Sequence, residues 1–256
     1  MRRVIALDLD GTLLRNDGTI SPRTLLALRQ CRQNGKRLVI ATARAPHMVA
    51  LALPVDLAEV PWVCYNRAEV YEGGQRVLQN AIDPTTTKEI IQTILAANPR
   101  ATISVAIDDL LFSNRPFGGP WNPQVADLYE VTDRPAARIM FDMPDIGNAD
   151  GLAAMLSDKC RFIVTDHGAL GQVMAASASK AWALKVLLSR WKLALTDVIA
   201  FGDDANDIEM LVESGLGIAM GNACDQLKEV ADRVTLSNNE DGIAEVLEAM
   251  LREPDA

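Results

Sequence analysis

Short apolar runs alternate with segments of helical spacing at both ends of the chain. In the N-terminal part, residues 4–7, 37–41 and 61–65 are apolar runs of the length of a buried strand. Between the first two runs, Ser21-Pro22 is typical of a helix start, because serine caps free backbone N–H groups and proline fits the first turn. This part of the chain is therefore expected to form strands separated by helices.

The C-terminal part continues the same alternation. Ser179 is placed to cap a helix that runs through Trp191. Further strands are expected at residues 198–201, 216–219 and 233–236, and further helices at 207–212, 223–230 and 242–251. Buried strands that alternate with helices predict an α/β fold, a Rossmann-like doubly wound parallel sheet with helices on both faces.

The middle of the chain departs from this alternation. Residues 86–97 have helical spacing, and the apolar runs 102–107 and 110–113 are separated by the short gap of a hairpin. Strands are also expected at 138–142, 162–165 and 172–175, with a helix near 150–157. We therefore predict an inserted α+β domain at residues 82–178, between the two parts of a core domain, residues 1–81 and 179–256.

The charge and hydropathy of the chain limit its partners. The 256 residues carry a formal net charge of −9 and no block of Lys or Arg, so they lack the basic stripe that nucleic-acid binding needs. No segment is apolar enough to span a bilayer, and Asp8 and Asp10 interrupt the first apolar run too early for a signal peptide. We therefore expect a cytoplasmic protein with no nucleic-acid or membrane partner.

Four polar segments follow predicted strands or open predicted helices, where an open α/β sheet places its ligands. They are residues 8–12 (D-L-D-G-T), Thr42 in T-A-R, Lys180 behind Ser179, and residues 202–207 (G-D-D-A-N-D). Each segment alone has an ordinary structural explanation as a turn, a helix cap or a solvated lysine. Their combination is more specific, because it contains every part of a phosphoryl-transfer site.

The chemistry of these side chains matches that reaction. Asp8, Asp10 and Asp203 offer the hard oxygen donors that Mg²⁺ prefers. Mg²⁺ and Lys180 would supply the local positive charge that an acidic protein needs in order to bind a phosphate. The Thr42 hydroxyl can donate a hydrogen bond to a phosphoryl oxygen. One carboxylate can attack phosphorus, and a second can exchange protons with the leaving alcohol and with water.

The same segments carry a family resemblance. D-L-D-G-T-L-L, A-T-A-R, S-K-A and G-D-D-A-N-D-I-E-M-L resemble, in order and spacing, the four motifs of the haloacid dehalogenase (HAD) superfamily. The stretches G-I-A-M-G-N-A and A-D-R-V-T-L-S-N-N-E-D-G-I-A are similar to its Cof-type, sugar-phosphatase-like branch. The resemblance implies a Rossmann-like core and an α/β cap between the second and third motifs, where the insert is predicted. It also implies a Mg²⁺-dependent phosphatase of small, sugar-phosphate-like monoesters that forms an aspartyl phosphate.

The resemblance further implies a role for each motif residue. Asp8 would be the nucleophile, and Asp10 the general acid and base. The ligands of Mg²⁺ would be Asp8, the backbone carbonyl of Asp10, Asp203 and, through water, Asp207. The residues that bind the phosphate and substrate would be Thr42, Ala43, Arg44, Lys180 and Asn206.

Two positions depart from the pattern of that branch, which usually has T-G-R and N-G where this chain has T-A-R and Asn66-Arg67. Ala43 adds a methyl group near the expected phosphate site. Arg67 is expected at the rim of the site, either solvated or in contact with a second anionic group of the substrate.

Other functions remain open on the same residues. A phosphomutase or phosphotransferase shares the aspartyl phosphate but passes the group to a sugar. A phosphoacceptor receiver domain is opposed by the position of Asp8, because such a domain has a chain about half as long and its phosphorylated Asp follows the third strand rather than the first. For this chain we expect a small phosphorylated metabolite as partner and a monomer or small homo-oligomer.

Overall fold

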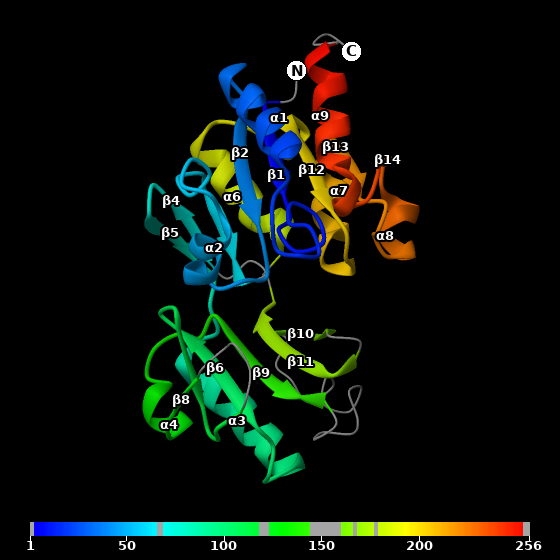
Figure 1. The fold of residues 1–256 in the computed structure, drawn as a ribbon. Coiled ribbons are helices and arrows are strands. Elements are labelled where there is room, and N and C mark those ends of the chain that lie inside the picture. Colours follow the sequence, from blue (N-terminus) through cyan, green and yellow to red (C-terminus); the bar gives the residue numbers. More distant parts are fainter. Residues whose placement is uncertain are drawn as a thin grey trace. The chain divides into compact units, whose positions relative to one another are not determined.

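The computed structural model describes residues 3–65, 69–117, 123–143, 160–165, 168–176 and 179–252 (Figure 1). The chain forms two compact units, Met1–Val77 with Ser179–Ala256, called the core unit here, and Leu78–Ala178, called the inserted unit. The helix predicted near 150–157 lies outside the described residues, as do Asn66 and Arg67. No helix in the described part of the chain is long and apolar enough to cross a membrane.

The core unit is built on one sheet, which in the described residues has eight strands in the order β14-β13-β12-β1-β2-β3-β4-β5. The strands from β14 to β3 run parallel, whereas β4 is antiparallel to β3. Their bounds are β1 Val4–Leu7, β2 Arg37–Ala41, β3 Trp62–Cys64, β4 Glu69–Glu72, β5 Gln75–Gln79, β12 Val198–Gly202, β13 Leu216–Ala219 and β14 Arg233–Val234.

The helices of the core unit lie on both faces of this sheet. The chain moves from β1 to β2 in one direction along the sheet and from β12 to β13 in the other, so right-handed crossovers place α1 and α7 on opposite faces. Helix α9 packs beside α1 (Figure 1), and contacts also join α6 to α7. The predicted doubly wound α/β class is thus confirmed. The helix bounds are α1 Pro22–Gln33, α2 Pro46–Ala52, α6 Lys180–Arg190, α7 Ile208–Glu213, α8 Asp225–Val230 and α9 Gly242–Arg252.

The predicted caps form as expected. The Ser21 hydroxyl accepts from the backbone N–H of Thr24 at 3.0 Å, and the Ser179 hydroxyl from that of Trp182 at 2.9 Å. The cap at Ser179 matters for the site, because it sets the first residue of α6 as Lys180. In the described residues of this unit, short 3-10 helices also lie at Leu195–Asp197, Ala205–Asp207 and Asn238–Glu240.

The inserted unit has a mostly antiparallel sheet, with strand order β10-β11-β9-β6-β7-β8 in its described residues. Alternate residues of β6 and β9, such as Val105 and Ile139, pack with α3 in one apolar core. This is the α+β pattern that the sequence predicted. The bounds are α3 Pro84–Ala97, β6 Ile103–Ile107, β7 Leu110–Ser113, β8 Gln124–Val125, α4 Leu128–Val131, β9 Arg138–Asp142, β10 Cys160–Thr165 and β11 Leu170–Ala175.

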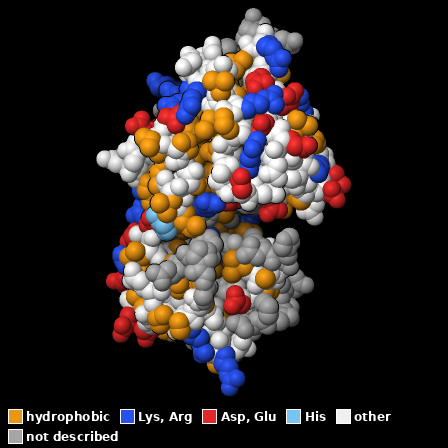
Figure 2. Space-filling view, in the orientation of Figure 1, with side chains coloured by type: hydrophobic (Ala, Val, Ile, Leu, Met, Phe, Trp, Pro, Cys, Tyr) orange, Lys and Arg blue, Asp and Glu red, His pale blue; other side chains and the backbone are white. Residues whose placement is uncertain are grey.

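Basic and acidic side chains are mixed over the surface. Figure 2 shows Lys and Arg interspersed with Asp and Glu on the described part of the visible face, without a continuous basic stripe. Arg23, for example, pairs with Glu245 and Glu248, and Arg29 with Asp56.

Candidate active site

The site lies at the carboxyl ends of β1 and β12, two neighbouring parallel strands of the core sheet. Asp8 follows β1 directly, and its backbone N–H donates to the carbonyl of Phe201 in β12 (N–O 3.1 Å). Asp203 follows β12 directly. Because both strands are fully buried and pair in register, the sheet itself sets the spacing between Asp8 and Asp203.

Two glycines let the loops that carry the acids approach one another. Gly11 has φ +74°, and a Cβ at this position would lie 2.2 Å from a carboxylate oxygen of Asp203. A Cβ on Gly202 would lie 2.5 Å from the Cβ of Asp207. Neither distance is tolerated between atoms that are not bonded, so a larger residue at either position would displace an acid.

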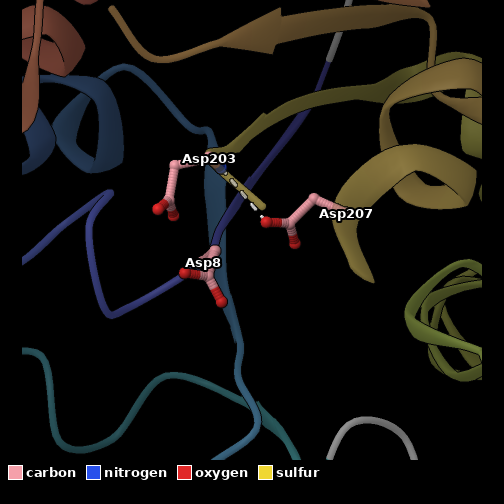
Figure 3. Close-up of side chains that lie close together, drawn as sticks. All are labelled: Asp8, Asp203 and Asp207. Atoms are coloured by element: carbon pink, nitrogen blue, oxygen red, sulfur yellow. Dashed lines mark hydrogen bonds between the residues drawn. The ribbon is translucent and has the colours of Figure 1, made fainter. Parts of the chain in front are cut away.

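Among the described residues, Asp8, Asp203 and Asp207 form a cluster that could hold a metal ion, with one carboxylate oxygen of each within 4.8 Å of the others (Figure 3). Hydrogen bonds from the two loops orient the carboxylates of Asp203 and Asp207. Asp203 Oδ1 accepts from the Thr12 hydroxyl at 2.8 Å. Asp207 Oδ2 accepts from the backbone N–H groups of Asp203 and Asp204 at 3.1 and 3.2 Å. The backbone of the loop after β12 therefore fixes the carboxylate of Asp207.

Lys180 supplies the positive charge of the cluster. Its side chain is fully buried, and its Nζ donates to Asp8 Oδ1 and to Asp207 Oδ1, each at 2.6 Å. Asn206 Oδ1 lies 3.5 Å from the same Nζ. The ammonium thus links the loop after β1 to the loop after β12, and Asp8 keeps a second oxygen that is not bonded to Lys180.

The cluster has more negative than positive charge. Burial raises the pKa of Asp8 well above its usual range, opposed by Lys180 and reinforced by Asp207 and Asp203. Burial also raises the pKa of Asp203 to about 6, although the hydrogen bond from the Thr12 hydroxyl lowers this pKa. Burial alone would lower the pKa of Lys180, but Asp207 and Asp8 outweigh it and hold that pKa above its ordinary value. A divalent cation would offset the excess charge, so this all-oxygen donor set fits an ion such as Mg²⁺.

The segment Thr42-Ala43-Arg44 follows β2, the other neighbour of β1 in the sheet. Thr42 is buried; its N–H donates to the Val63 carbonyl at 2.8 Å, and its hydroxyl oxygen accepts from the Arg44 N–H at 3.1 Å. The guanidinium of Arg44 binds the carboxylate of Asp10, with Nε–Oδ2 2.8 Å and Nη2–Oδ1 2.6 Å. The Asp10 carboxylate therefore pairs with Arg44 rather than joining the three-acid cluster.

Two residues of the site were not assigned a role from the sequence. Asn222 Nδ2 donates to the Gly11 carbonyl at 2.8 Å, and Asn222 Oδ1 accepts from the N–H of Asn238 at 2.9 Å. The buried Asn238 in turn donates to the Leu14 carbonyl at 2.9 Å. Both asparagines thus hold the loop after β1. Their sequence signal was present in G-N-A and S-N-N, the stretches that matched the Cof-type pattern.

Comparison with known proteins agrees with this geometry. The haloacid dehalogenase-like hydrolase family matches residues 5–247. Pyridoxal phosphate phosphatase YbhA of Escherichia coli (strain K12) is 30% identical, over 96% of this chain and 97% of its own. 5-Amino-6-(5-phospho-D-ribitylamino)uracil phosphatase YitU of Bacillus subtilis (strain 168) is 28% identical, over 95% and 96%.

A solved structure is similar over the same length. The crystal structure of TM0651 from Thermotoga maritima superposes with a TM-score of 0.84 at 28% identity, covering 97% of each chain. These matches confirm the family predicted from the motifs. They also confirm the predicted enzyme class, a hydrolase of phosphate monoesters. The chain belongs to the haloacid dehalogenase-like hydrolases.

Proposed function

We propose that the chain is a Mg²⁺-dependent phosphatase that hydrolyses small phosphate monoesters through a phosphorylated Asp8. The observation that carries this proposal is the position of Lys180. Its buried ammonium binds both Asp8 and Asp207, and Asp203 lies in the same cluster. Fixed positive charge beside a carboxylate nucleophile is what the transfer of a phosphoryl group requires.

The metal ligands would be Asp8, Asp203, the backbone carbonyl of Asp10 and, through water, Asp207. When bound, Mg²⁺ would supply positive charge against the phosphoryl oxygens. Lys180 and Asn206 would contribute further polar contacts to the phosphate. The Thr42 hydroxyl oxygen already accepts from the backbone N–H of Arg44, so its own proton points away from that N–H group and can be donated to a phosphoryl oxygen.

The reaction takes two steps. In the first, Oδ2 of Asp8 attacks phosphorus, the bond from phosphorus to the ester oxygen breaks, and Asp10 gives its proton to the leaving alcohol. In the second, water attacks the phosphorus of the aspartyl phosphate and Asp10 takes a proton from it. The bond from Asp8 to phosphorus then breaks, which releases inorganic phosphate and restores both carboxyl groups.

The inserted domain, residues 82–178, is assigned as a cap that selects the leaving group, with residues 1–81 and 179–256 as the catalytic core. The relatives named above act on pyridoxal phosphate and on a phosphorylated ribitylaminouracil. These relatives support a small phosphorylated metabolite as the substrate here. The net charge of −9 argues against a nucleic-acid partner, because binding to nucleic acid needs positive charge. A cytoplasmic location and a monomer or small homo-oligomer remain predictions.

The test is phosphate release from a panel of sugar phosphates, nucleotides, pyridoxal phosphate and phospho-acids, with Mg²⁺ and with excess chelator. We expect turnover of at least one ester with Mg²⁺ and none with chelator. Full activity in chelator would refute metal dependence. Recovery of the phosphate on a second sugar hydroxyl, with little free phosphate, would identify a phosphotransferase instead.

A further inference from the structure

Arg44 was expected to bind phosphate. In the structure, its guanidinium forms an ion pair with the carboxylate of Asp10. The two N–H···O bonds are parallel, 2.8 Å from Nε and 2.6 Å from Nη2, and use both carboxylate oxygens. This is the bidentate arrangement in which arginine holds a carboxylate most firmly in one orientation. The side chain of Asp10 is 57% exposed and that of Arg44 is 25% exposed.

The backbone on each side of the pair is anchored. The Arg44 N–H donates to Thr42 Oγ1 at 3.1 Å, and its carbonyl accepts from the N–H of the buried Tyr65 at 3.0 Å. Asp10 forms a backbone bridge to Leu14 in the loop after β1. The ion pair therefore ties the loop that carries Asp8 to the loop that carries Thr42, across two neighbouring strands.

Stability alone does not explain this pair. An exposed ion pair contributes little to folding, and the chain has others of that kind, such as Arg29 with Asp56 at 2.6 Å. The pair formed by Arg44 differs because its acid is two residues from Asp8. An exposed aspartate without such a partner would rotate freely, whereas proton transfer needs its oxygen within hydrogen-bond reach of the reacting atom.

We propose that Arg44 is a positioning residue that acts through Asp10, by orienting the carboxylate that exchanges protons with the leaving alcohol and with water. The inference rests on the function proposed above. The two oxygens of a carboxylate offer about four lone-pair sites, and the guanidinium fork uses two of them. Asp10 can therefore remain bound to Arg44 while it transfers a proton.

A double-mutant cycle tests this role. Arg44→Gln, Asp10→Ala and the double variant are assayed for kcat with p-nitrophenyl phosphate, whose leaving group scarcely needs a proton, so that the Asp10 variants keep measurable activity. Asp10 still has to take a proton from water in the second step, so if Arg44 acts through Asp10, Arg44→Gln lowers kcat about tenfold in the wild type and causes little further loss in Asp10→Ala. Arg44→Lys keeps the charge but not the fork, and should recover only part of kcat.

Inhibition by inorganic phosphate gives a second readout. A positioning role leaves the inhibition constant for phosphate unchanged in Arg44→Gln, whereas direct phosphate binding would raise it. Arg29→Gln removes an exposed Arg–Asp pair outside the site and is the matched control for the loss of a surface charge; its kcat should equal that of the wild type. Thermal melts establish that each variant is folded.

The two proposals fail in different ways. Losses that multiply in the double variant, or a raised inhibition constant for phosphate in Arg44→Gln, would overturn the role of Arg44 in an otherwise active phosphatase. A wild-type enzyme that releases no phosphate from any ester would overturn the proposed function and this inference with it.

Discussion

Replacing Asp203 with Asn should make the metal-free protein more stable while it removes Mg²⁺ binding. Asparagine has nearly the same shape as aspartate, and its amide oxygen can still accept the hydrogen bond from the Thr12 hydroxyl, 2.8 Å away. The substitution therefore removes little besides one negative charge. That charge lies in a cluster with Asp8 and Asp207.

The pKa of Asp203 sets the size of the effect. It is raised from 3.8 to about 6 in the folded protein, first by burial and then by neighbouring acids. At roughly 1.4 kcal/mol per pKa unit, the charged carboxylate costs the folded state about 3 kcal/mol at neutral pH. The variant should recover about 1–3 kcal/mol of unfolding free energy, because burying the amide also has a cost.

The pH dependence follows from the sign of the shift. Because the pKa of Asp203 is higher in the folded than in the unfolded chain, the folded wild type binds more protons between about pH 4 and about pH 6. Above about pH 6 the charged Asp203 lowers the unfolding free energy of the wild type by its full amount, and this loss becomes smaller as the pH falls toward about 4. The advantage of Asp203→Asn should therefore be complete at about pH 7.5 and small at about pH 4.

Urea unfolding in excess EDTA at these two pH values measures the difference, as a shift in midpoint at constant slope. Asp204→Asn is the matched control, because Asp204 is an exposed acid of the same loop outside the three-acid cluster; its unfolding free energy should change by about 0.5 kcal/mol or less. Added Mg²⁺ should reverse the ranking, since an ion at about 1,000 times its Kd stabilises the wild type by about 4.1 kcal/mol.

Two results would refute this reasoning. If Asp203→Asn is less stable than the wild type in EDTA at about pH 7.5, the carboxylate is not destabilised by its surroundings. If Mg²⁺ stabilises both proteins equally, Asp203 does not hold the metal.

Three further substitutions test the site. Asp8→Asn should abolish turnover, and fluoroberyllate, an aspartyl-phosphate mimic, should inhibit the wild type; normal turnover by the variant would exclude Asp8 as nucleophile. Lys180→Met leaves buried acids without their ammonium, so urea unfolding in EDTA should show a loss of about 3–5 kcal/mol, and an unchanged midpoint would contradict the buried pairing. Gly11→Ala should abolish Mg²⁺-dependent activity, because its Cβ would lie 2.2 Å from an Asp203 oxygen. Gly35→Ala, also at positive φ but with no atom within 4 Å of its Cβ, is the matched control for backbone strain and should remain active.

Much of the fold could be predicted because its signals are local. The caps at Ser21 and Ser179 depend on hydrogen bonds to residues only three positions away, and both form as predicted. The buried strands β1, β2 and β12 are continuous apolar runs, which a central parallel strand requires.

The predictions were less accurate where local signals are weak. Helix α2 (Pro46–Ala52) was not predicted, because it is short and has no side-chain cap. Helix α3 begins at Pro84 rather than at residue 86, since Asp83 caps it. Strand β14 is Arg233–Val234 rather than 233–236, because it is exposed and its pairing with β13 involves only those two residues.

The sequence by itself determined which residues could do chemistry. Acids after two buried strands, a threonine after a third and a lysine at a capped helix start were all identified from local spacing and motif order. Only the tertiary structure decided which residues of the site bind one another. Lys180 binds Asp207, 27 positions away, Arg44 binds Asp10 across 34 positions, and Asn222 binds Gly11 across 211. Such pairings depend on which strands are neighbours in the sheet, and strand order is set by packing over the whole chain rather than by any local segment.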